Sequence, residues 1–267
     1  MSAQLSVGII GAGVMGEALI AALISYGVKP DLITISEKRT ARSDELTKRY
    51  GIKSAEIKSN VHSAQAILLV VKPQDMGNVL DEIKTAINPQ ALVVTFAAGK
   101  TISFISTGLA SANPVIRVMP NTATLVGAGM AAISLGVGVS TEQSNFVSGF
   151  LSATGKVIEV SEDLQDAVTA TSGSGPAYFF RFVEAIVDGA QILGLSKEVA
   201  TQLTVQTMIG AAKLLEDSGK SATTLREDVT SPNGTTAAAL ASFDTDQISK
   251  MVSTAMKAAR DRSQELA

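Results

Sequence analysis

The sequence contains no cysteine, and this absence excludes several kinds of chemistry. Disulfide bonds, zinc sites built on cysteine and a thiol nucleophile are all ruled out. Histidine is nearly absent as well, since His62 is the only one among 267 residues. It lies in a polar stretch before a predicted strand, where a solvated or capping role is expected, and nothing supports a serine–histidine–aspartate triad around it. We expect no metal site.

The chain also lacks a strong excess of charge of either sign. Its net charge is −3, and charged residues make up 18% against 46% hydrophobic residues. Nucleic-acid-binding proteins normally carry a concentrated basic surface, and disordered chains lack the apolar residues needed for a core. The composition therefore predicts a folded chain of one large domain or two modest ones that does not bind nucleic acid.

Neither a secretion signal nor a membrane-spanning segment is expected. The first residues lead into a predicted strand without a basic region followed by an apolar segment. Residues 118–141 carry no charge and are long enough to cross a membrane. However, Pro120, Asn121 and four glycines interrupt this stretch, which is typical of turns between short strands. A cytoplasmic location is expected.

What the first half does contain is an alternation of strand and helix patterns. Short apolar runs predict strands at 5–10, 32–36, 66–71, 91–95 and 115–118. The intervening segments predict helices at 14–26, 40–50, 75–85 and 101–109. Gly27 is expected to end the first helix. Strands that alternate with helices form the crossover units of a parallel sheet, so we predict an α/β fold with a Rossmann-type doubly wound domain over residues 1–160.

From residue 161 onward the pattern is helical only. Helices are predicted at 176–194, 197–217, 234–242 and 245–265. In the first of these, Arg181, Glu184 and Asp188 share one face and the remaining surface is apolar. A helix of this kind is buried on most sides, as in a bundle or a subunit interface. Residues 161–267 are therefore predicted to form an all-α domain.

A glycine-rich segment lies between the first predicted strand and the first predicted helix. Residues Gly11, Ala12, Gly13, Val14, Met15 and Gly16 fit the pattern G-x-G-x-x-G. The first glycine allows a tight turn, the second lets the backbone approach a pyrophosphate, and the third permits close packing of helix on strand. The N–H groups at the helix start then hold the phosphate charge. A purely structural turn is the alternative, but the position favours a dinucleotide-binding loop.

The residues after the second predicted strand bear on the choice between NAD and NADP. Glu37 lies near the position where an acid binds the ribose 2′-hydroxyl of NAD. Lys38, Arg39 and Arg42 could instead pair with a 2′-phosphate, with Ser36 as a hydrogen-bond donor. These charges could also simply solvate the start of a helix. We predict NADPH as the cofactor, with NADH as the alternative.

Further segments, in their order along the chain, resemble the pyrroline-5-carboxylate reductase family. They are Val71-Lys72-Pro73-Gln74, Ala97-Ala98-Gly99, residues 116–122, residues 172–178 and residues 225–236. With the glycine loop they span nearly the whole chain, and the last two are the most specific. The resemblance implies NAD(P)H-dependent hydride transfer to the C=N bond of 1-pyrroline-5-carboxylate, giving L-proline. It also implies a homodimer that assembles into a larger homo-oligomer.

The resemblance implies roles for individual residues as well. Several lie at the carboxyl ends of predicted strands, where open α/β sheets bind ligands, although a solvent-facing charge is the alternative for Lys72 and an ordinary turn for Pro120 and Asn121. The implied cofactor residues beyond the glycine loop are Ser36, Lys38, Arg39, Asn60, Val71, Lys72, Pro73, Ala97, Ala98, Gly99, Pro120 and Asn121.

The implied substrate site is a tight turn that runs into a helix, at residues 231–236. A helix start of this kind can hold a carboxylate without an arginine, and a well-capped helix start is the structural alternative. In the family, the threonine that matches Thr236 faces the ring nitrogen, so Thr236 is the implied catalytic residue. The implied substrate-binding residues are Ser231, Gly234, Thr235, Thr236 and Ser174.

Two positions depart from the family pattern, and two other functions compete with it. Ala123 stands where proline is usual, and Asn233 stands where glycine is usual. Asparagine tolerates left-handed backbone geometry, so the turn at Asn233 can persist. A β-hydroxyacid dehydrogenase is disfavoured because no lysine follows the Ser-Gly turn before Lys197. A catalytically silent NADPH-binding sensor is disfavoured because Ser231 and Thr236 are retained.

Overall fold

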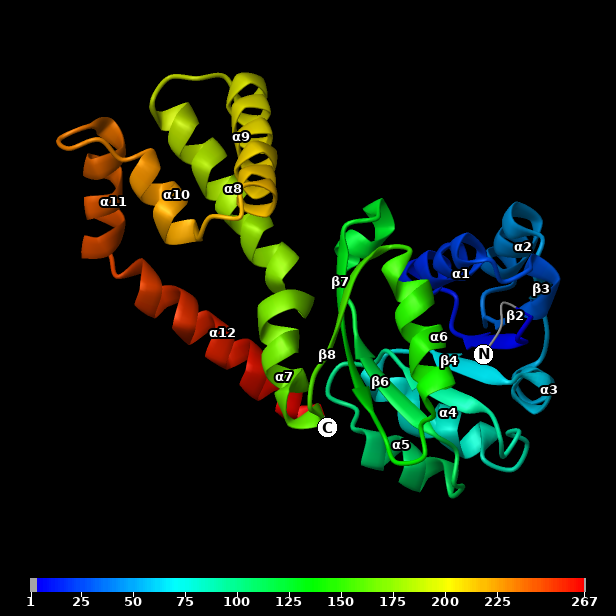
Figure 1. The fold of residues 1–267 in the computed structure, drawn as a ribbon. Coiled ribbons are helices and arrows are strands. Elements are labelled where there is room, and N and C mark those ends of the chain that lie inside the picture. The colour runs from blue at the N-terminus through cyan, green and yellow to red at the C-terminus, as the bar shows by residue number, and fades with distance from the viewer. Residues whose placement is uncertain (1–3, 267) are drawn as a thin grey trace. The chain divides into compact units, whose positions relative to one another are not determined.

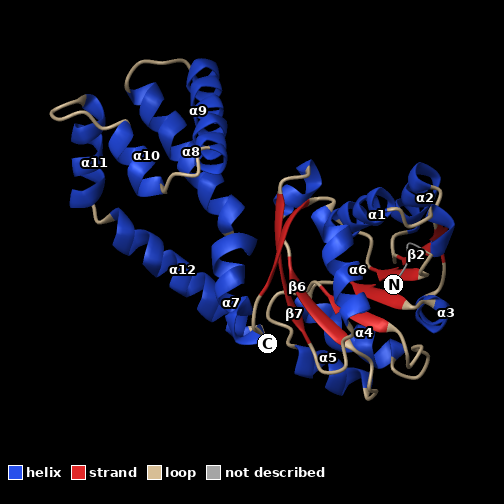
Figure 2. Ribbon diagram, viewed as in Figure 1, coloured by secondary structure: helices blue, strands red, loops and turns tan. Residues whose placement is uncertain are grey.

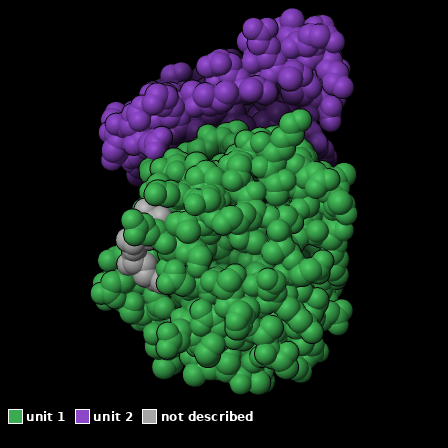
Figure 3. All heavy atoms as spheres, turned by 90° about the vertical axis from the view of Figure 1, so that its right-hand side faces the viewer, with its two compact units in different colours: residues 1–175, 258–267 green, residues 176–257 purple. Residues whose placement is uncertain are grey.

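The computed structural model describes residues 4–266, and the chain divides into two compact units (Figure 3). The first comprises residues 1–175 together with 258–267, and the second comprises residues 176–257. Residues 161–175 group with the first unit because they pack against its sheet. The buried side chain of Gln165, for example, donates to Ser134 Oγ at 2.8 Å. The predicted division after residue 160 lies inside the first unit and stays a prediction about domains.

One sheet forms the centre of the first unit (Figure 2). Its strands are β1 (Val7–Ile10), β2 (Ile33–Ser36), β3 (Lys53–Ser54), β4 (Ala66–Leu69), β5 (Leu92–Thr95), β6 (Val115–Met119), β7 (Gly129–Leu135) and β8 (Gly155–Glu159). Within the described residues they pair in the order β3-β2-β1-β4-β5-β6-β7-β8. The predicted strands are confirmed as β1, β2, β4, β5 and β6.

The sheet departs from the predicted parallel arrangement at one pair. All neighbouring strands from β3 to β6 are parallel, but β7 runs antiparallel to β6. A parallel crossover needs about a dozen or more connecting residues, and the connection from Met119 to Gly129 is shorter than that. The chain therefore returns beside β6 in the opposite direction.

Helices cover both faces of the sheet, which confirms the doubly wound fold (Figure 1). One hydrophobic cluster includes side chains of α1 (Val14–Tyr26), α2 (Thr40–Tyr50) and α6 (Thr141–Ser152). The other includes side chains of α3 (Ile57–Ser63), α4 (Met76–Ile83) and α5 (Ile102–Leu109). Successive strand residues point to opposite faces, so Ile9 enters the first cluster and Ile10 the second. Gly27 ends α1 in the left-handed conformation, as predicted.

The chain from residue 161 is helical, as predicted. After α7 (Gln165–Val168) and a π-helical turn, the helices are α8 (Gly175–Ile192), α9 (Lys197–Asp217), α10 (Ala222–Asp228), α11 (Thr235–Thr245) and α12 (Ile248–Glu265). The short α10 was not predicted. No helix in the described part of the chain is long and apolar enough to span a membrane.

The second unit buries very little of its own surface. Across residues 176–257, all of which the structure describes, only Val187, Ala200 and Thr204 are buried. Phe180 on α8 is 63% exposed, and Leu193 is 87% exposed. A small domain depends on the apolar area that it removes from water, so these helices need additional surface to cover them.

Candidate nucleotide and substrate site

The predicted cofactor segments all leave the sheet at the same edge. Parallel register sets the last residues of neighbouring strands side by side: Ile10 pairs with Ser36 and with Leu69, and Leu69 pairs with Thr95. The segments that follow β1, β2, β4, β5 and β6 include residues 11–16, 37–39, 71–73, 97–99 and 120–121. The carboxyl edge of an open parallel sheet is where ligands bind. The structure thus brings these segments together at one edge.

The three glycines of the loop differ in whether the surrounding protein leaves room for a side chain. Gly11 has a φ of +91°, and a Cβ there would lie 2.6 Å from the carbonyl oxygen of Val70. A Cβ on Gly16 would lie 2.5 Å from the carbonyl oxygen of Gly11, so the fold itself requires both glycines. A Cβ on Gly13 would meet nothing within 4 Å. The chain itself therefore gives Gly13 no packing reason to be glycine, and its backbone is open to a ligand.

The start of α1 is also open to an anion. Gly13 is the N-cap residue and has no side chain to accept hydrogen bonds from the first N–H groups of the helix. Val14, the first helical residue, is 65% exposed, and Met15 is half-buried. Unpaired N–H groups together with the positive end of the helix dipole suit a phosphate group.

Two side chains from beyond β2 hold Ala12 in place. The Ala12 N–H donates to Oε2 of Glu37 at 3.0 Å, and Nε of Arg42 donates to the Ala12 carbonyl at 3.2 Å. Arg42 is held in turn by ion pairs with Glu17 and Glu45. Arg42 therefore supports the glycine loop, and its positive charge is neutralised by Glu17 of α1 and Glu45 of α2. Its sequence position had suggested a 2′-phosphate partner instead.

Glu37 is hydrogen-bonded through both carboxylate oxygens. Oε1 accepts from the backbone N–H of Arg39 at 3.1 Å and from its Nε at 2.9 Å. Burial raises the pKa of Glu37, but the hydrogen bonds from Arg39 and from Ala12 outweigh it and hold the pKa below its ordinary value. The Glu37 side chain is 9% exposed, whereas Arg39 is 65% exposed and Lys38 is exposed. Glu37 is therefore a fixed negative charge beside the loop.

Ser36 and Asn60 make their hydrogen bonds within the protein. The Ser36 hydroxyl donates to the Ala55 carbonyl at 2.8 Å and accepts from Asn60 Nδ2 at 3.0 Å. Asn60 is 1% exposed and also donates to the Thr34 carbonyl at 3.1 Å. A Cβ on Gly8 would lie 2.5 Å from Asn60 Oδ1, so the glycine makes room for this side chain. Asn60 therefore contacts Ser36, the last residue of β2, and its role toward a cofactor stays a prediction.

The segments after β4 and β5 differ in exposure. Lys72 is exposed and begins a short 3-10 turn, while Val71 and Pro73 are half-buried. Ala97 is buried and Ala98 is half-buried. A ligand at this edge would therefore meet backbone and small side chains more than charge.

Gly99 is constrained by the end of the chain. Its φ is +74°, and a Cβ there would lie 2.6 Å from the carbonyl oxygen of Ser263 in α12. Ser263 Oγ donates to Asp166 Oδ1 at 2.7 Å, and the buried Arg117 on β6 donates to the same oxygen at 3.3 Å. This buried polar group anchors the C-terminal helix behind the cofactor segment. Sequence reasoning missed it, because no spacing rule connects residues this far apart.

Two of the family-like segments form one structural block. Asn121 Nδ2, next to the buried Pro120, donates to Ser172 Oγ at 3.3 Å. A Cβ on Gly173 would lie 2.5 Å from Met119 Cε, so the Met119 side chain packs directly against this glycine. Ser172 was not singled out from the sequence, although its place in the Ser-Gly-Ser-Gly segment is a signal that could have identified it.

The predicted substrate residues of the second unit form a tight turn before α11. The Gly234 N–H donates to the Ser231 carbonyl at 3.1 Å, Pro232 takes the second position, and Asn233 has a φ of +60°. These are the features of a type II turn. A Cβ on Gly234 would lie 2.4 Å from Ser231 Oγ and 3.1 Å from the Ser231 carbonyl oxygen, so the turn brings these residues close together. Gly234 is the N-cap of α11 and provides no side-chain cap, so the N–H groups at the helix start can bind a carboxylate.

The predicted substrate residues are divided between the two units. Ser231 and Thr235 are exposed and Thr236 is half-buried, all in the second unit. Ser174 is half-buried in the first unit, where its N–H donates to the Thr169 carbonyl at 2.8 Å in the π-helical turn before α8. The assignment of Ser174 to the same substrate as the turn is therefore part of the proposal below.

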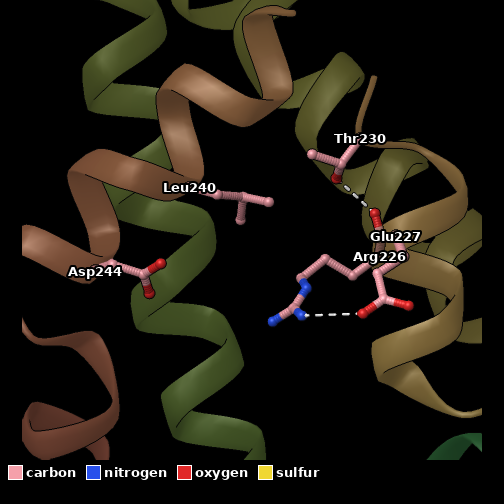
Figure 4. Close-up of a pocket in the computed structure, with 5 residues that line it drawn as sticks. All are labelled: Arg226, Glu227, Thr230, Leu240 and Asp244. Carbon is pink, nitrogen blue, oxygen red and sulfur yellow. Dashed lines mark hydrogen bonds and ion pairs between the residues drawn. The ribbon is translucent and has the colours of Figure 1, made fainter. Parts of the chain in front are cut away.

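A pocket of about 250 Å³ lies beside the substrate turn, between α10 and α11 (Figure 4). It is lined by Arg226, Glu227, Thr230, Leu240 and Asp244. The Arg226 guanidinium lies 3.9 Å from Glu227 Oε1, and the Thr230 hydroxyl donates to the Arg226 carbonyl at 2.6 Å. The pocket lining carries one positive and two negative side chains, so it is unfavourable for a carboxylate ligand. The N–H groups at the start of α11 suit a carboxylate better.

Comparison with known proteins supplies independent observations. The family described as pyrroline-5-carboxylate reductase dimerisation matches residues 162–266, and the family described as NADP oxidoreductase, coenzyme F420-dependent, matches residues 6–99. The pyrroline-5-carboxylate reductase of a Synechocystis species is 39% identical over 268 residues, covering 100% of this chain and 99% of that protein.

Solved structures agree over the full length. The structure of a pyrroline-5-carboxylate reductase from Coxiella burnetii matches with a TM-score of 0.90 and 33% identity, over 99% of both chains. That of the Plasmodium falciparum pyrroline carboxylate reductase, with NADP bound, matches with a TM-score of 0.89 and 26% identity, over 100% of this chain and 99% of the other.

Proposed function

This chain belongs to the pyrroline-5-carboxylate reductase family, and from that premise we propose how its residues carry out the reaction. The protein is an NAD(P)H-dependent oxidoreductase that reduces the C=N bond of 1-pyrroline-5-carboxylate to L-proline in proline biosynthesis. The observation that carries this conclusion is 39% identity to a reductase of that name over the whole chain.

The proposed cofactor is NADPH, bound along the carboxyl edge of the sheet. The open backbone of Gly13 and the uncapped start of α1 fit the pyrophosphate. Lys38 and Arg39 would face the 2′-phosphate, and both are exposed. Residues 71–73, 97–99 and 120–121 would line the ribose and the nicotinamide. The bound nicotinamide supplies the hydride, and the protein supplies position and charge complementarity.

The proposed substrate site is the turn at Ser231–Gly234 together with the start of α11. Its N–H groups would hold the substrate carboxylate, with Ser174 as a further contact from the start of α8. The Thr236 hydroxyl would face the ring nitrogen. A protonated imine is already a strong electrophile, so a hydroxyl and backbone donors suffice, and a chain with a single exposed histidine can carry out the reaction.

The proposed assembly is a homodimer that associates into a larger homo-oligomer. The match to the dimerisation family over residues 162–266 supports self-association, and so do the exposed apolar side chains of residues 176–257. The cytoplasmic location expected from the sequence stays a prediction.

The reaction is tested by mixing purified protein with 1-pyrroline-5-carboxylate and following the absorbance of the reduced nicotinamide. Imine-dependent consumption supports the reductase, and a higher kcat/KM with NADPH than with NADH supports the cofactor. If both nucleotides bind and neither is consumed, the reductase assignment fails. The alternative function, a catalytically silent NADPH-binding sensor, then replaces it.

The role of Thr236 is tested by Thr236→Ala. Loss of one polar contact at the reacting centre is expected to lower kcat about 10- to 1000-fold. Thr245→Ala is the matched control, because Thr245 lies at the other end of α11, where its hydroxyl donates to the Ala241 carbonyl. Wild-type kcat in Thr236→Ala would contradict the assignment.

A further inference from the structure

Arg117 is a buried cation that binds two acids beside the segment proposed to line the nicotinamide. It lies on β6 and is 3% exposed, and in the sheet it pairs in register with Thr95, the last residue of β5. Its Nη1 donates to Oε1 of Glu162 at 3.4 Å, and its Nη2 donates to Oδ1 of Asp166 at 3.3 Å. One guanidinium can hold two carboxylates because its N–H donors form a rigid, planar fork.

Glu162 connects Arg117 to one end of the segment between β5 and α5, residues 96–101. Oε1 of Glu162, the oxygen that accepts from Arg117, also accepts from the N–H of Ile102 at 2.7 Å. Ile102 is the first residue of α5, and an N–H at a helix start has no partner within the helix. The carboxylate therefore fixes the point at which the segment enters α5.

Asp166 connects Arg117 to the middle of the same segment through the end of the chain. Its Oδ1 accepts from the buried Ser263 Oγ at 2.7 Å. A Cβ on Gly99 would lie 2.6 Å from the Ser263 carbonyl oxygen and 2.7 Å from Leu266 Cβ, so residues 263–266 lie directly against Gly99. These residues belong to the first unit, as Arg117 does. Arg117 thus holds, through one carboxylate, the turn that supports Gly99.

The segment itself has few side-chain contacts with which to fix its backbone. Ala97, Ala98 and Gly99 carry at most a methyl group, and glycine has more conformational freedom to lose on folding than any other residue. A misplacement of about 1 Å in the groups that position a reacting centre can lower its rate roughly 100-fold. The contacts behind the segment therefore decide how accurately its backbone is placed.

We propose that Arg117 is a positioning residue for the nicotinamide segment of the site. Through Glu162 it fixes the start of α5, and through Asp166 and Ser263 it fixes the turn behind Gly99. This role rests on the proposed function, in which residues 97–99 line the ribose and the nicotinamide. Arg117 acts on hydride transfer only through the position of that backbone.

Ser263→Ala tests the arm through Asp166, because it removes one hydroxyl and leaves Arg117 and both acids in place. With protein in excess over NADPH and with saturating imine, the first-order rate constant of NADPH oxidation does not depend on how much of the protein is folded. It is expected to fall roughly tenfold as the segment loses its support. The Kd for NADPH, measured by nicotinamide fluorescence, should change less than about threefold, because the pyrophosphate contacts remain. Ser253→Ala, at an exposed position of α12, should change neither quantity.

Arg117→Lys tests the common origin of the two arms. Lysine keeps the positive charge but lacks the fork that binds both acids, so the same rate constant is expected to fall roughly 10- to 100-fold. In the double variant with Ser263→Ala, the loss should be clearly smaller than the product of the two single losses, because both substitutions break one chain of contacts. Arg260→Lys, at an exposed position of α12, is the matched control.

Hydrogen exchange gives a readout that does not depend on the reaction. Without nucleotide, the amides of residues 97–102 should exchange roughly five- to tenfold faster in Ser263→Ala than in wild type, the change that one lost hydrogen bond can produce. The amides of α2, which packs near β3 at the far edge of the sheet from Arg117, should exchange as in wild type. NADPH should slow the exchange of residues 97–102 in wild type, and slow it less in both variants.

An unchanged rate constant in Ser263→Ala, together with faster exchange of residues 97–102, would overturn the proposal and leave these contacts a role in stability only. Fully multiplicative losses in the double variant would also overturn it, since Arg117 would then act by another route. If Arg117→Lys does not fold, the rate constant of Ser263→Ala decides alone. If wild-type protein binds NADPH but does not reduce the imine, the proposed reaction fails. The exchange of residues 97–102 then decides this inference: slowing by NADPH that the variants lose supports it, and no slowing in wild type refutes it.

Discussion

At the scale of the residue, Asn233 carries the left-handed backbone of the substrate turn, with a φ of +60°. Asparagine occupies this region at low cost, whereas a β-branched residue does so with strain. Asn233→Val is therefore expected to lower the free energy of unfolding by about 1–2 kcal/mol and to raise the KM for the imine. Asn233→Gly should keep both near wild type. Denaturant titration and steady-state kinetics measure the two effects.

Asn78→Val is the control for this substitution. Asn78 is exposed on α4, where the backbone is right-handed and asparagine and valine have similar helix propensities. Its free energy of unfolding should change by less than about 0.5 kcal/mol, and its KM should not change. Equal losses of stability in the two valine variants would show that the turn conformation does not matter.

At the scale of the element, Glu17 joins α1 to α2 through hydrogen bonds from Arg42, Arg49 and Tyr50. Burial raises the pKa of Glu17, but hydrogen bonds from Arg42, Tyr50 and Arg49 outweigh it and hold the pKa below its ordinary value. A carboxyl whose pKa is lower in the folded protein stabilises it above the unfolded pKa, about 4.3 for glutamate, and this contribution is lost as pH falls through the folded pKa.

Glu17→Gln is therefore expected to lower the free energy of unfolding by about 1 kcal/mol at neutral pH. The difference from wild type should shrink as the pH falls below about 4. Urea unfolding at a series of pH values measures it, with Glu82→Gln as an exposed control on α4. A difference that stayed constant down to low pH would mean that packing, and not charge, causes the effect.

At the scale of the whole molecule, the second unit carries large apolar side chains that it cannot cover itself. Phe179 and Phe180 on α8 are 59% and 63% exposed. Burial against a second copy stabilises by about 25 cal/mol for each Å² of apolar surface removed from water, and oligomerisation makes apparent stability depend on concentration. Phe180→Asp is expected to reduce the sedimenting mass, lower the Tm and remove its dependence on protein concentration.

Val137→Asp is the matched control for this change. Val137 is 100% exposed in the first unit, so the same change of side chain should leave the mass and the Tm near wild type. A Phe180→Asp protein that sediments with wild-type mass would contradict the role of α8 in self-association.

Much of the fold could be predicted because its signals are local. A strand buried on both faces is a continuous apolar run, as in residues 66–71, and the glycine pattern at 11–16 has its meaning only between a strand and a helix. The two-residue β3 and the short α10 were not predicted, because segments this short are too brief to show a hydrophobic periodicity. Likewise, residues 118–141 indicated turns between short strands but not that β7 would run antiparallel to β6.

By itself the sequence determined the doubly wound domain, the helical second half, the glycine loop and the turn at Asn233, because each depends on residues that are neighbours in the chain. Only the tertiary structure decided how the charges after β2 are used. From the sequence, Arg42 could have paired with a 2′-phosphate. In the folded protein it forms an ion pair with Glu17 and donates a hydrogen bond to the Ala12 carbonyl. The tertiary structure also placed Ser263 against Gly99. Contacts between residues far apart in the chain depend on how the helices and strands pack, and the sequence pattern within one helix or strand does not reveal them.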